Sequence, residues 1–465
     1  MSEQAYAAPQ QVGAEWFPNS YDEYRKVRMR PGSALWNAVP PQFELHAMPV
    51  GWLFKSPVTL SIVDDGASWL QTFKVEDFID NRERKSAQLP RTGVPVSGFK
   101  INGPLNTSDI ADEIIVFQGA SYFRALGKGH VYGLSARGLA IRTASPQGEE
   151  FPAFRNFWVE RPKPGSDTIR IYALLDSQST TGAFAFTVTP GEATAMDVEA
   201  VLFPRRDLTE VGLAPLTSMN MLNPLNPVRV ADFRPRIHDS DGLAIQTGSG
   251  ERIWRPINNP ATLQLSAFLD TNPRGFGLIQ RQRTFADYQD LEARYDKRPS
   301  AWVEPKEGFG EGSVVLVEIP TVEEIHDNIV TMWRPKNPIP AGKPHRISYR
   351  LTWRNHVPTR SDGPWVANSR SGNVNLGPRD GRRRFVIDYV DQSPFTGEDL
   401  PEAAVTVSGG TVSDVVVQKN PETGGLRAAF IFQPGDRDRA DIRLNLGSWN
   451  GRTPETWIYR WVRDR

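Results

Sequence analysis

Residues 168–188 read TIRIYALLDSQSTTGAFAFTV, and they contain two runs in which apolar side chains alternate with polar or small ones, 168–174 and 183–188. A period of two with β-branched and aromatic residues predicts half-buried β-strands. The same alternation recurs at 262–268, 313–319 and 345–354. We therefore predict an all-β fold of mainly antiparallel strands, arranged as sandwiches.

Helical signals are few. Ser20 and Glu23 have the spacing of a capping box, which predicts a short helix that runs to Met29. Residues 285–295 carry apolar side chains at helical spacing and are long enough for about three turns, with Tyr295 at the end. Because strands and helices do not alternate, we do not expect a parallel α/β sheet.

A domain boundary is expected near residue 380. The stretch 359–384 is polar, rich in Gly and Arg, and has no periodicity. About six short alternating runs follow it within about 80 residues, a spacing typical of an immunoglobulin-like sandwich. We expect a large β-sandwich domain at 17–375, a linker at 376–384 and a small immunoglobulin-like domain at 385–465. The six runs are 385–390, 404–407, 412–417, 426–432, 442–446 and 456–462.

The composition of the chain excludes several classes of partner and site. The chain of 465 residues has 54 Lys and Arg against 54 Asp and Glu, so it lacks the basic excess of nucleic-acid binders. A neutral polymer is a better candidate for a large partner. With no Cys and no HExxH motif among six His, we expect no metal site and no cofactor. No apolar run approaches the roughly 18–20 residues of a membrane span, and the first residues lack the features of a signal peptide.

Two His-Asp pairs, His238-Asp239 and His326-Asp327, stand among polar or turn-forming residues. The aspartates are 327 − 239 = 88 positions apart, so only the fold could bring them together. Two carboxyl groups suit glycoside hydrolysis, in which one protonates the leaving oxygen and the other helps water to attack. The alternative is that each Asp only shapes its loop through an Asx-turn or a cap.

Aromatic residues interleaved with Arg are the second feature. Tyr122 stands near Arg124, and Arg298 near Trp302. Aromatic rings match the CH faces of sugars, and polar forks match their hydroxyls. The alternative is that these rings belong to the hydrophobic core. The phenol of Tyr295 could pass a proton along a water chain, or could simply pack.

The sequence resembles the OpgG/OpgD (MdoG/MdoD) family of periplasmic glucan biosynthesis proteins, from about Tyr21 to the C-terminus. The segments that carry the resemblance are 119–124 (GASYFR), 131–141 (VYGLSARGLAI), 149–151 (EEF), 171–177 (IYALLDS), 214–219 (APLTSM), 237–243 (IHDSDGL), 254–260 (WRPINNP), 272–280 (NPRGFGLIQ), 298–305 (RPSAWVEP), 317–321 (VEIPT) and 455–457 (ETW).

The resemblance implies a large N-terminal sandwich (galactose-mutarotase-like) with a long cleft, a small immunoglobulin-like C-terminal domain, and a periplasmic location with a signal peptide that this sequence does not contain. It implies inverting action on linear β-1,2-glucan, as an endo-hydrolase or a transglycosylase. By motif, Asp327 would be the general acid and Asp239 the general base reached through waters. Tyr295 and Glu324 would lie near the proton path. Desolvation of Asp327 would help to keep it protonated.

Four residues are expected to line the sugar cleft: Tyr122, Arg124, Arg298 and Trp302. The stretch 359–384 departs most from the family pattern, in a region that can cover the catalytic waters, so the choice between hydrolase and transglycosylase stays open. A second hypothesis is a glucan-binding or scaffolding protein without turnover. We expect no nucleic-acid partner and no membrane insertion, and the sequence leaves a homodimer open.

Overall fold

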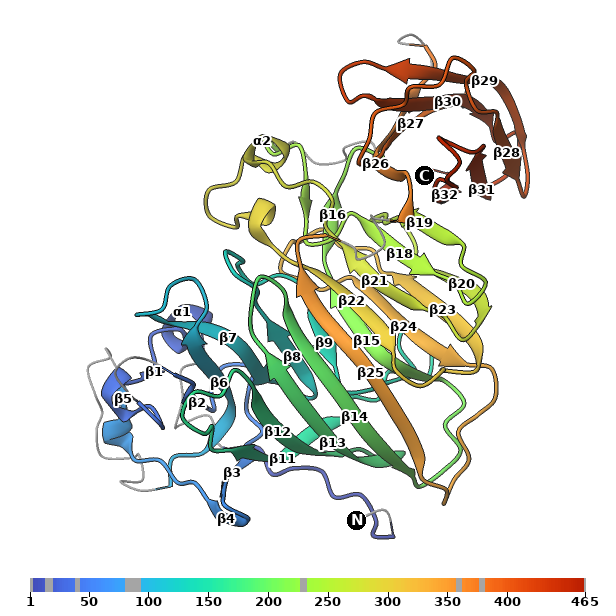
Figure 1. Cartoon of the computed structure of the whole chain (residues 1–465). Helices are drawn as coiled ribbons and strands as arrows, with labels where there is room; N and C mark the ends of the chain where they lie inside the picture. Colours follow the sequence, from blue (N-terminus) through green and yellow to red (C-terminus); the bar gives the residue numbers. More distant parts are fainter. Residues whose placement is uncertain are drawn as a thin grey trace. The chain divides into compact units, whose positions relative to one another are not determined.

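The computed structural model describes residues 3–12, 20–37, 42–79, 93–225, 232–356, 362–375 and 381–463 (Figure 1). Its regular structure is almost entirely β-strand, as predicted. The chain folds into two units, and each unit is built from segments that are separated in the sequence. Unit 1 comprises Met1–Pro215, Pro305–Gly312 and Met332–Arg354, and unit 2 comprises Leu216–Glu304, Ser313–Thr331 and Asn355–Arg465.

The expected domain limits stay a prediction. Residue 17, residues 359–361 and the first five residues of the expected linker, 376–380, lie outside the described residues.

Unit 1 consists of strands with a few short helices. Its elements are α1 (Tyr21–Tyr24), β1 (Arg28–Met29), η2 (Pro31–Ser33), β2 (Glu44–Pro49), β3 (Thr59–Asp64), β4 (Ala67–Leu70), η3 (Val75–Asp77), β5 (Phe78–Ile79), β6 (Val96–Pro104), β7 (Ala111–Gln118), β8 (Tyr122–Ala125), β9 (Ser135–Arg137), β10 (Ala140–Ile141), β11 (Ala153–Glu160), β12 (Ile169–Asp176), β13 (Thr180–Thr189), β14 (Thr194–Pro204) and β25 (His345–Arg354). Four strands are divided between the units: β15 (Val211–Ser218), β22 (Ser300–Pro305), β23 (Glu311–Glu318) and β24 (Ile329–Pro335).

Two sheets form the core of unit 1. One has the order β2-β6-β7-β8-β9, and the other β25-β14-β13-β12-β11-β3-β4. The quoted runs are β12 and β13, which pair antiparallel with Ile171 opposite Phe186. Phe117 of the first sheet meets Phe186 of the second at 5.2 Å between ring centroids. Burial of such rings between facing sheets stabilises the sandwich.

Unit 2 has further strands and two short helical segments. Its elements are β16 (Asn220–Leu222), β17 (Ile237–His238), β18 (Gly242–Gln246), β19 (Arg252–Pro256), β20 (Gln264–Thr271), β21 (Gly275–Ile279), α2 (Phe285–Tyr288), η4 (Tyr295–Lys297), β26 (Trp365–Asn373), β27 (Arg383–Val390), β28 (Ala403–Val407), β29 (Thr411–Asn420), β30 (Gly425–Gln433), β31 (Arg439–Leu446) and β32 (Thr456–Val462).

All six strands expected after residue 385 are present, and they belong to two sheets. One has the order β26-β27-β30-β29, and the other contains β28-β31-β32 followed by β19-β18-β21. Phe385 of the first sheet lies 5.8 Å from Trp457 of the second, between ring centroids. Because β32 pairs in parallel with β19, the second sheet continues into strands that precede residue 385.

Both expected helices are shorter than predicted. Ser20 caps α1 by accepting a hydrogen bond from the Glu23 backbone, but the helix ends at Tyr24 instead of Met29. Helix α2 ends at Tyr288, because Gln289 takes a left-handed backbone conformation with φ of 59°. Tyr295 therefore lies in η4, outside α2. No described helix is long and apolar enough to cross a bilayer.

Candidate functional site

Six of the eight predicted site residues belong to unit 2, and the other two, Tyr122 and Arg124, belong to β8 of unit 1. The six are Asp239, Tyr295, Arg298, Trp302, Glu324 and Asp327.

One asparagine connects the chain segments that carry the two aspartates. Asn220 pairs with His238 across β16 and β17. Its backbone N–H donates to Asn328 Oδ1 at 2.8 Å, and its carbonyl accepts from Asn328 Nδ2 at 3.1 Å. His238 precedes Asp239, and Asn328 follows Asp327. The fold therefore ties the segments of both aspartates to the same residue, although 88 positions separate them.

Asp239 is 3% exposed and forms an ion pair with Arg298, whose Nη1 donates to its Oδ1. The guanidinium carbon of Arg298 also lies 4.2 Å from the centroid of the Tyr295 ring. Burial alone would lower the pKa of Arg298, but the neighbouring carboxylate of Asp239 contributes to an overall rise. The cation therefore stays charged and favours the ionised form of Asp239.

Tyr295 extends this chain of contacts to the loop of the second aspartate. Its hydroxyl donates to Glu324 Oε2 at 2.8 Å. Burial, and to a smaller extent the hydrogen bond to Glu324, raise the pKa of Tyr295, so the phenol keeps its proton. A protonated phenol can donate and accept at once, which is what a proton relay needs.

Arg234, which the sequence analysis did not single out, holds Glu324 in place. Its Nη1 donates to Glu324 Oε2 and to Asp290 Oδ2, both at 2.8 Å, and its Nη2 donates to Asp232 Oδ2 at 2.9 Å. Three carboxylates thus surround one guanidinium. Residues 234–236 are not in a strand, so no periodicity marked Arg234, and of its three partners only Asp232 is close to it in the sequence.

Gln280 is a second residue that the sequence analysis did not assign. Its Nε2 donates to the carbonyl of His238 at 2.9 Å and to that of Tyr295 at 3.1 Å. Its Oε1 lies 2.9 Å from Nδ1 of His238, which is fully buried. Burial lowers the pKa of His238, against the opposite effect of Asp241, whose Oδ1 lies 3.3 Å from Nε2. Because the amide hydrogens of Gln280 point to the two carbonyls, its Oε1 accepts from Nδ1. Gln280 therefore fixes the segments of Asp239 and Tyr295 relative to each other.

Asp327 is exposed, as are its neighbours Glu324 and His326. It lies in the loop between β23 and β24, three positions after Glu324. Desolvation was expected to help keep Asp327 protonated, but its side chain is open to water, so the protein alone does not supply that desolvation. Any desolvation has to come from what binds over the loop.

The expected sugar-contacting residues have different environments. Trp302 is only 1% exposed and packs with Trp254 and Ile279 in the core of unit 2. As a correction, its ring has no open face for a sugar, because the core covers it. Tyr122 is half-buried and has the Arg137 guanidinium 4.7 Å from its ring centroid, and Arg124 is half-buried in the same strand.

The described residues contain no group of three or more His, Asp or Glu side chains arranged to hold a metal ion. The site in unit 2 offers carboxyl groups, one protonated phenol and two guanidinium groups. These can donate, accept and relay protons and can bind hydroxyl groups.

Comparisons with known proteins match one family over nearly the whole chain. The profile of a family described as "Periplasmic glucan biosynthesis protein, MdoG" matches residues 1–461. Glucans biosynthesis protein G of Vibrio cholerae serotype O1 is 48% identical over 443 residues, which are 95% of this chain and 81% of that protein. Glucans biosynthesis protein G 1 of Shewanella oneidensis is 48% identical over 444 residues, with the same two coverages of 95% and 81%.

Among solved structures, a galactose mutarotase related enzyme from Lactobacillus acidophilus matches 56% of this chain and 95% of its own. The identity is 8% and the TM-score 0.24. A score of that size supports no argument about this chain.

Proposed function

Because this chain belongs to the MdoG family of periplasmic glucan biosynthesis proteins, we propose that it is an enzyme of that biosynthesis which cleaves or transfers β-1,2-glucan with inversion. The family name supplies the role in glucan biosynthesis and the periplasmic location. The linkage, the reaction and the residue roles are our proposal. The observation that supports it most is a series of three contacts that leads from Asp239 to Glu324 in the loop of Asp327: an ion pair with Arg298, a cation–π contact of Arg298 with Tyr295, and a hydrogen bond of Tyr295 to Glu324.

In the proposed reaction Asp327 gives its proton to the glycosidic oxygen, and the bond from that oxygen to the anomeric carbon breaks. A water oxygen attacks the anomeric carbon from the opposite face, and its proton passes to Asp239. Hydrolysis consumes one water for each bond broken. In transfer, a sugar hydroxyl replaces that water, and its proton takes the same path.

The contacts of Asp239 suit a proton acceptor. Arg298 pairs with it, and a nearby positive charge favours an ionised carboxylate. Tyr295 keeps its proton and donates to Glu324, which holds the phenol in place before the reaction. In our proposal its oxygen accepts the proton of the attacking molecule while its own proton passes through water to Asp239. Arg234 holds Glu324 from the other side and so fixes the direction of the phenol.

The acid needs a proton at neutral pH, and the exposed position of Asp327 does not provide desolvation. We propose that the glucan itself covers this side chain when it binds. Replacing water around a carboxyl group with sugar disfavours its charged form and keeps the proton available for the leaving oxygen. This makes the acid active mainly when substrate is present.

Product analysis tests the proposal. The chain would be incubated with purified linear β-1,2-glucan, and the products followed by mass spectrometry and NMR. New reducing ends that first appear with inverted configuration indicate hydrolysis. A mass lower by one water with no reducing end indicates cyclisation by transfer. Glucan that binds but stays unchanged would refute the enzyme and support the non-catalytic glucan-binding protein.

A further inference from the structure

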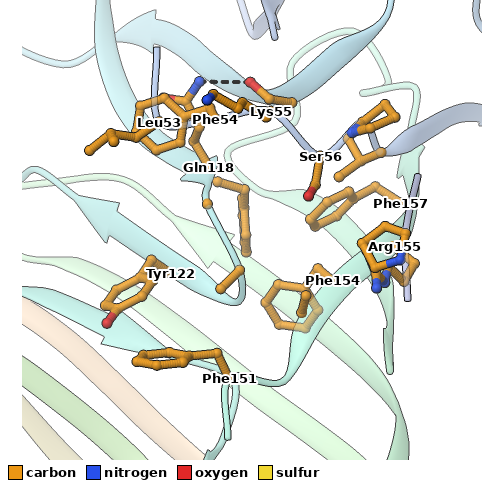
Figure 2. A pocket seen from close by; sticks show the side chains of 18 of the residues that line it. Leu53, Phe54, Lys55, Ser56, Gln118, Tyr122, Phe151, Phe154, Arg155 and Phe157 are labelled. Atoms are coloured by element: carbon orange, nitrogen blue, oxygen red, sulfur yellow. Dashed lines mark hydrogen bonds between the residues drawn. The ribbon is translucent and has the colours of Figure 1, made fainter. Parts of the chain in front are cut away.

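Unit 1 contains a cavity of about 240 Å³, and all the residues that line it belong to unit 1. It lies between the segment 53–58, the turn from β7 to β8 and the start of β11. Figure 2 shows Leu53 and Phe54 on one side and Tyr122 and Phe151 on the opposite side.

Two aromatic rings on one side of the cavity are held by an arginine. The guanidinium carbon of Arg137 lies 4.7 Å from the ring centroid of Tyr122 and 5.8 Å from that of Phe151. Glu149 fixes Arg137 through an ion pair of 2.6 Å. Phe151 is nevertheless 54% exposed, so a large apolar ring faces water in a hollow. Exposed apolar surface of this kind is costly unless something covers it.

The wall of the cavity is closely packed. The buried rings of Phe117, Phe154 and Phe157 pack on one another behind it, with centroids 5.5 to 6.2 Å apart. Gly119 at the β7–β8 turn has a φ of 79°, and a Cβ there would lie 3.0 Å from the Phe54 ring. Because the turn and the ring touch so closely, the cavity is preformed and cannot easily collapse.

Polar groups at the cavity have fixed directions. Gln118 donates its amide hydrogens to Tyr24 Oη at 2.5 Å and to Ser97 Oγ at 2.9 Å. This orients its Oε1 as an acceptor for a hydroxyl donor. Arg155 supplies donors at the edge, where its Nη2 lies 3.4 Å from the hydroxyl of Tyr6. A sugar ring is bound by flat aromatic rings together with hydrogen-bond acceptors and donors. Here the Oε1 of Gln118 is the acceptor and the guanidinium of Arg155 the donor.

We propose that this cavity is a second carbohydrate site, which holds one glucosyl ring of the glucan on the faces of Tyr122 and Phe151. Its volume lies below the roughly 300–1,000 Å³ typical of larger ligands, which favours a single ring. The identity of the sugar rests on the proposed function. The site anchors the polymer to unit 1 and adds affinity without taking part in the chemistry.

The test is calorimetric titration of the full chain with a linear β-1,2-linked glucose oligosaccharide, in an Asp327→Asn background that prevents turnover. Phe151→Ala removes an exposed ring and leaves the core intact. We expect it to weaken binding about tenfold, the effect of one lost aromatic contact. The matched control is Trp69→Ala, because Trp69 is 46% exposed in the same unit and does not line the cavity.

Equal affinities of the Phe151→Ala and Trp69→Ala chains would overturn the proposal. A second outcome would also overturn it. An apolar dye would bind in the cavity, its binding would be lost in Phe151→Ala, and the sugar would not displace it. Turnover of the chain with native Asp327 is measured separately. Glucan left intact, together with weakened binding in Phe151→Ala, refutes the enzyme and keeps the cavity as a sugar site.

Discussion

The hydroxyl of Tyr295 donates a hydrogen bond of 2.8 Å to Glu324, which lies 29 positions later in the chain. Arg298 in turn lies against the Tyr295 ring and forms an ion pair with Asp239. A buried phenol thus connects the carboxylate proposed as base with the loop that carries the carboxyl group proposed as acid.

Asp327→Asn should abolish turnover of linear β-1,2-glucan, because the N–H protons of an amide are far too weakly acidic to be transferred to the leaving oxygen. The loss expected for a general acid is about 10²–10⁴-fold. Since Asp327 is exposed, the free energy of unfolding should change by no more than about 0.5 kcal/mol. The measurement is product formation by mass spectrometry. Glu323→Gln, an exposed carboxyl group in the same loop, is the control, and equal activity of the two variants would remove the acid assignment.

Tyr295→Phe should reduce turnover about 100-fold or more, because it removes the hydroxyl and keeps the ring beneath Arg298. Glucan affinity should stay nearly unchanged, so kcat falls and KM does not. Tyr288→Phe is a matched control, since Tyr288 is also buried and donates to the Gln282 carbonyl at 3.1 Å. If both variants lost the same activity, a structural effect and not proton transfer would explain the result.

Much of the fold was predictable from the alternation of side chains. Residues 345–354 and 456–462 match β25 and β32 to the residue, because every second side chain points into a core. The helix expected at 285–295 failed, since Gln289 turns the chain and Asp290 accepts from the backbone N–H groups of Glu292 and Ala293. The spacing of apolar residues does not show that such turns and side-chain hydrogen bonds to the backbone compete with the helix.

The site was only partly predictable. The resemblance pointed to Asp239 and Tyr295, and the structure joins them through Arg298. The sequence alone could not show whether Trp302 belongs to the core or binds sugar, because the residue type is the same in both cases. Arg234 was missed because two of its three partners, Asp290 and Glu324, lie 56 and 90 positions away, and only the fold brings them together.

Arg298→Met should move the acid limb of the pH–activity profile to higher pH. A positive charge beside a carboxylate favours its ionised form, so removal of the charge makes Asp239 take up a proton at higher pH. The measurement is kcat/KM from about pH 4 to 9. Arg294→Met is the control, because Arg294 pairs with Asp296 at 2.7 Å outside the proposed path. An unshifted limb in Arg298→Met would contradict the role of Asp239 as base.

Arg234→Met should lower both stability and activity, because it leaves three carboxylates without their common cation. We expect a loss of about 2 kcal/mol in the free energy of unfolding, for a partly buried network. Arg234→Lys keeps the charge but not the fork, and should recover stability more than activity. Chemical denaturation and kcat measure the two effects. A normal kcat in Arg234→Met would show that activity does not depend on the positioning of Glu324 by Arg234.

His238→Asn should flatten the dependence of stability on pH in mildly acidic solution. Burial lowers the pKa of His238 below its unfolded value of about 6.5, so the unfolded chain binds a proton that the folded chain resists. The native chain should therefore lose stability as pH falls below about 6.5 toward the folded pKa. Asn keeps a donor toward Gln280 but does not titrate. The exposed His326→Gln is the control, and denaturation midpoints from pH 7.5 to 5 give the slopes. A slope in His238→Asn as steep as in the control would show that other groups cause the acid sensitivity.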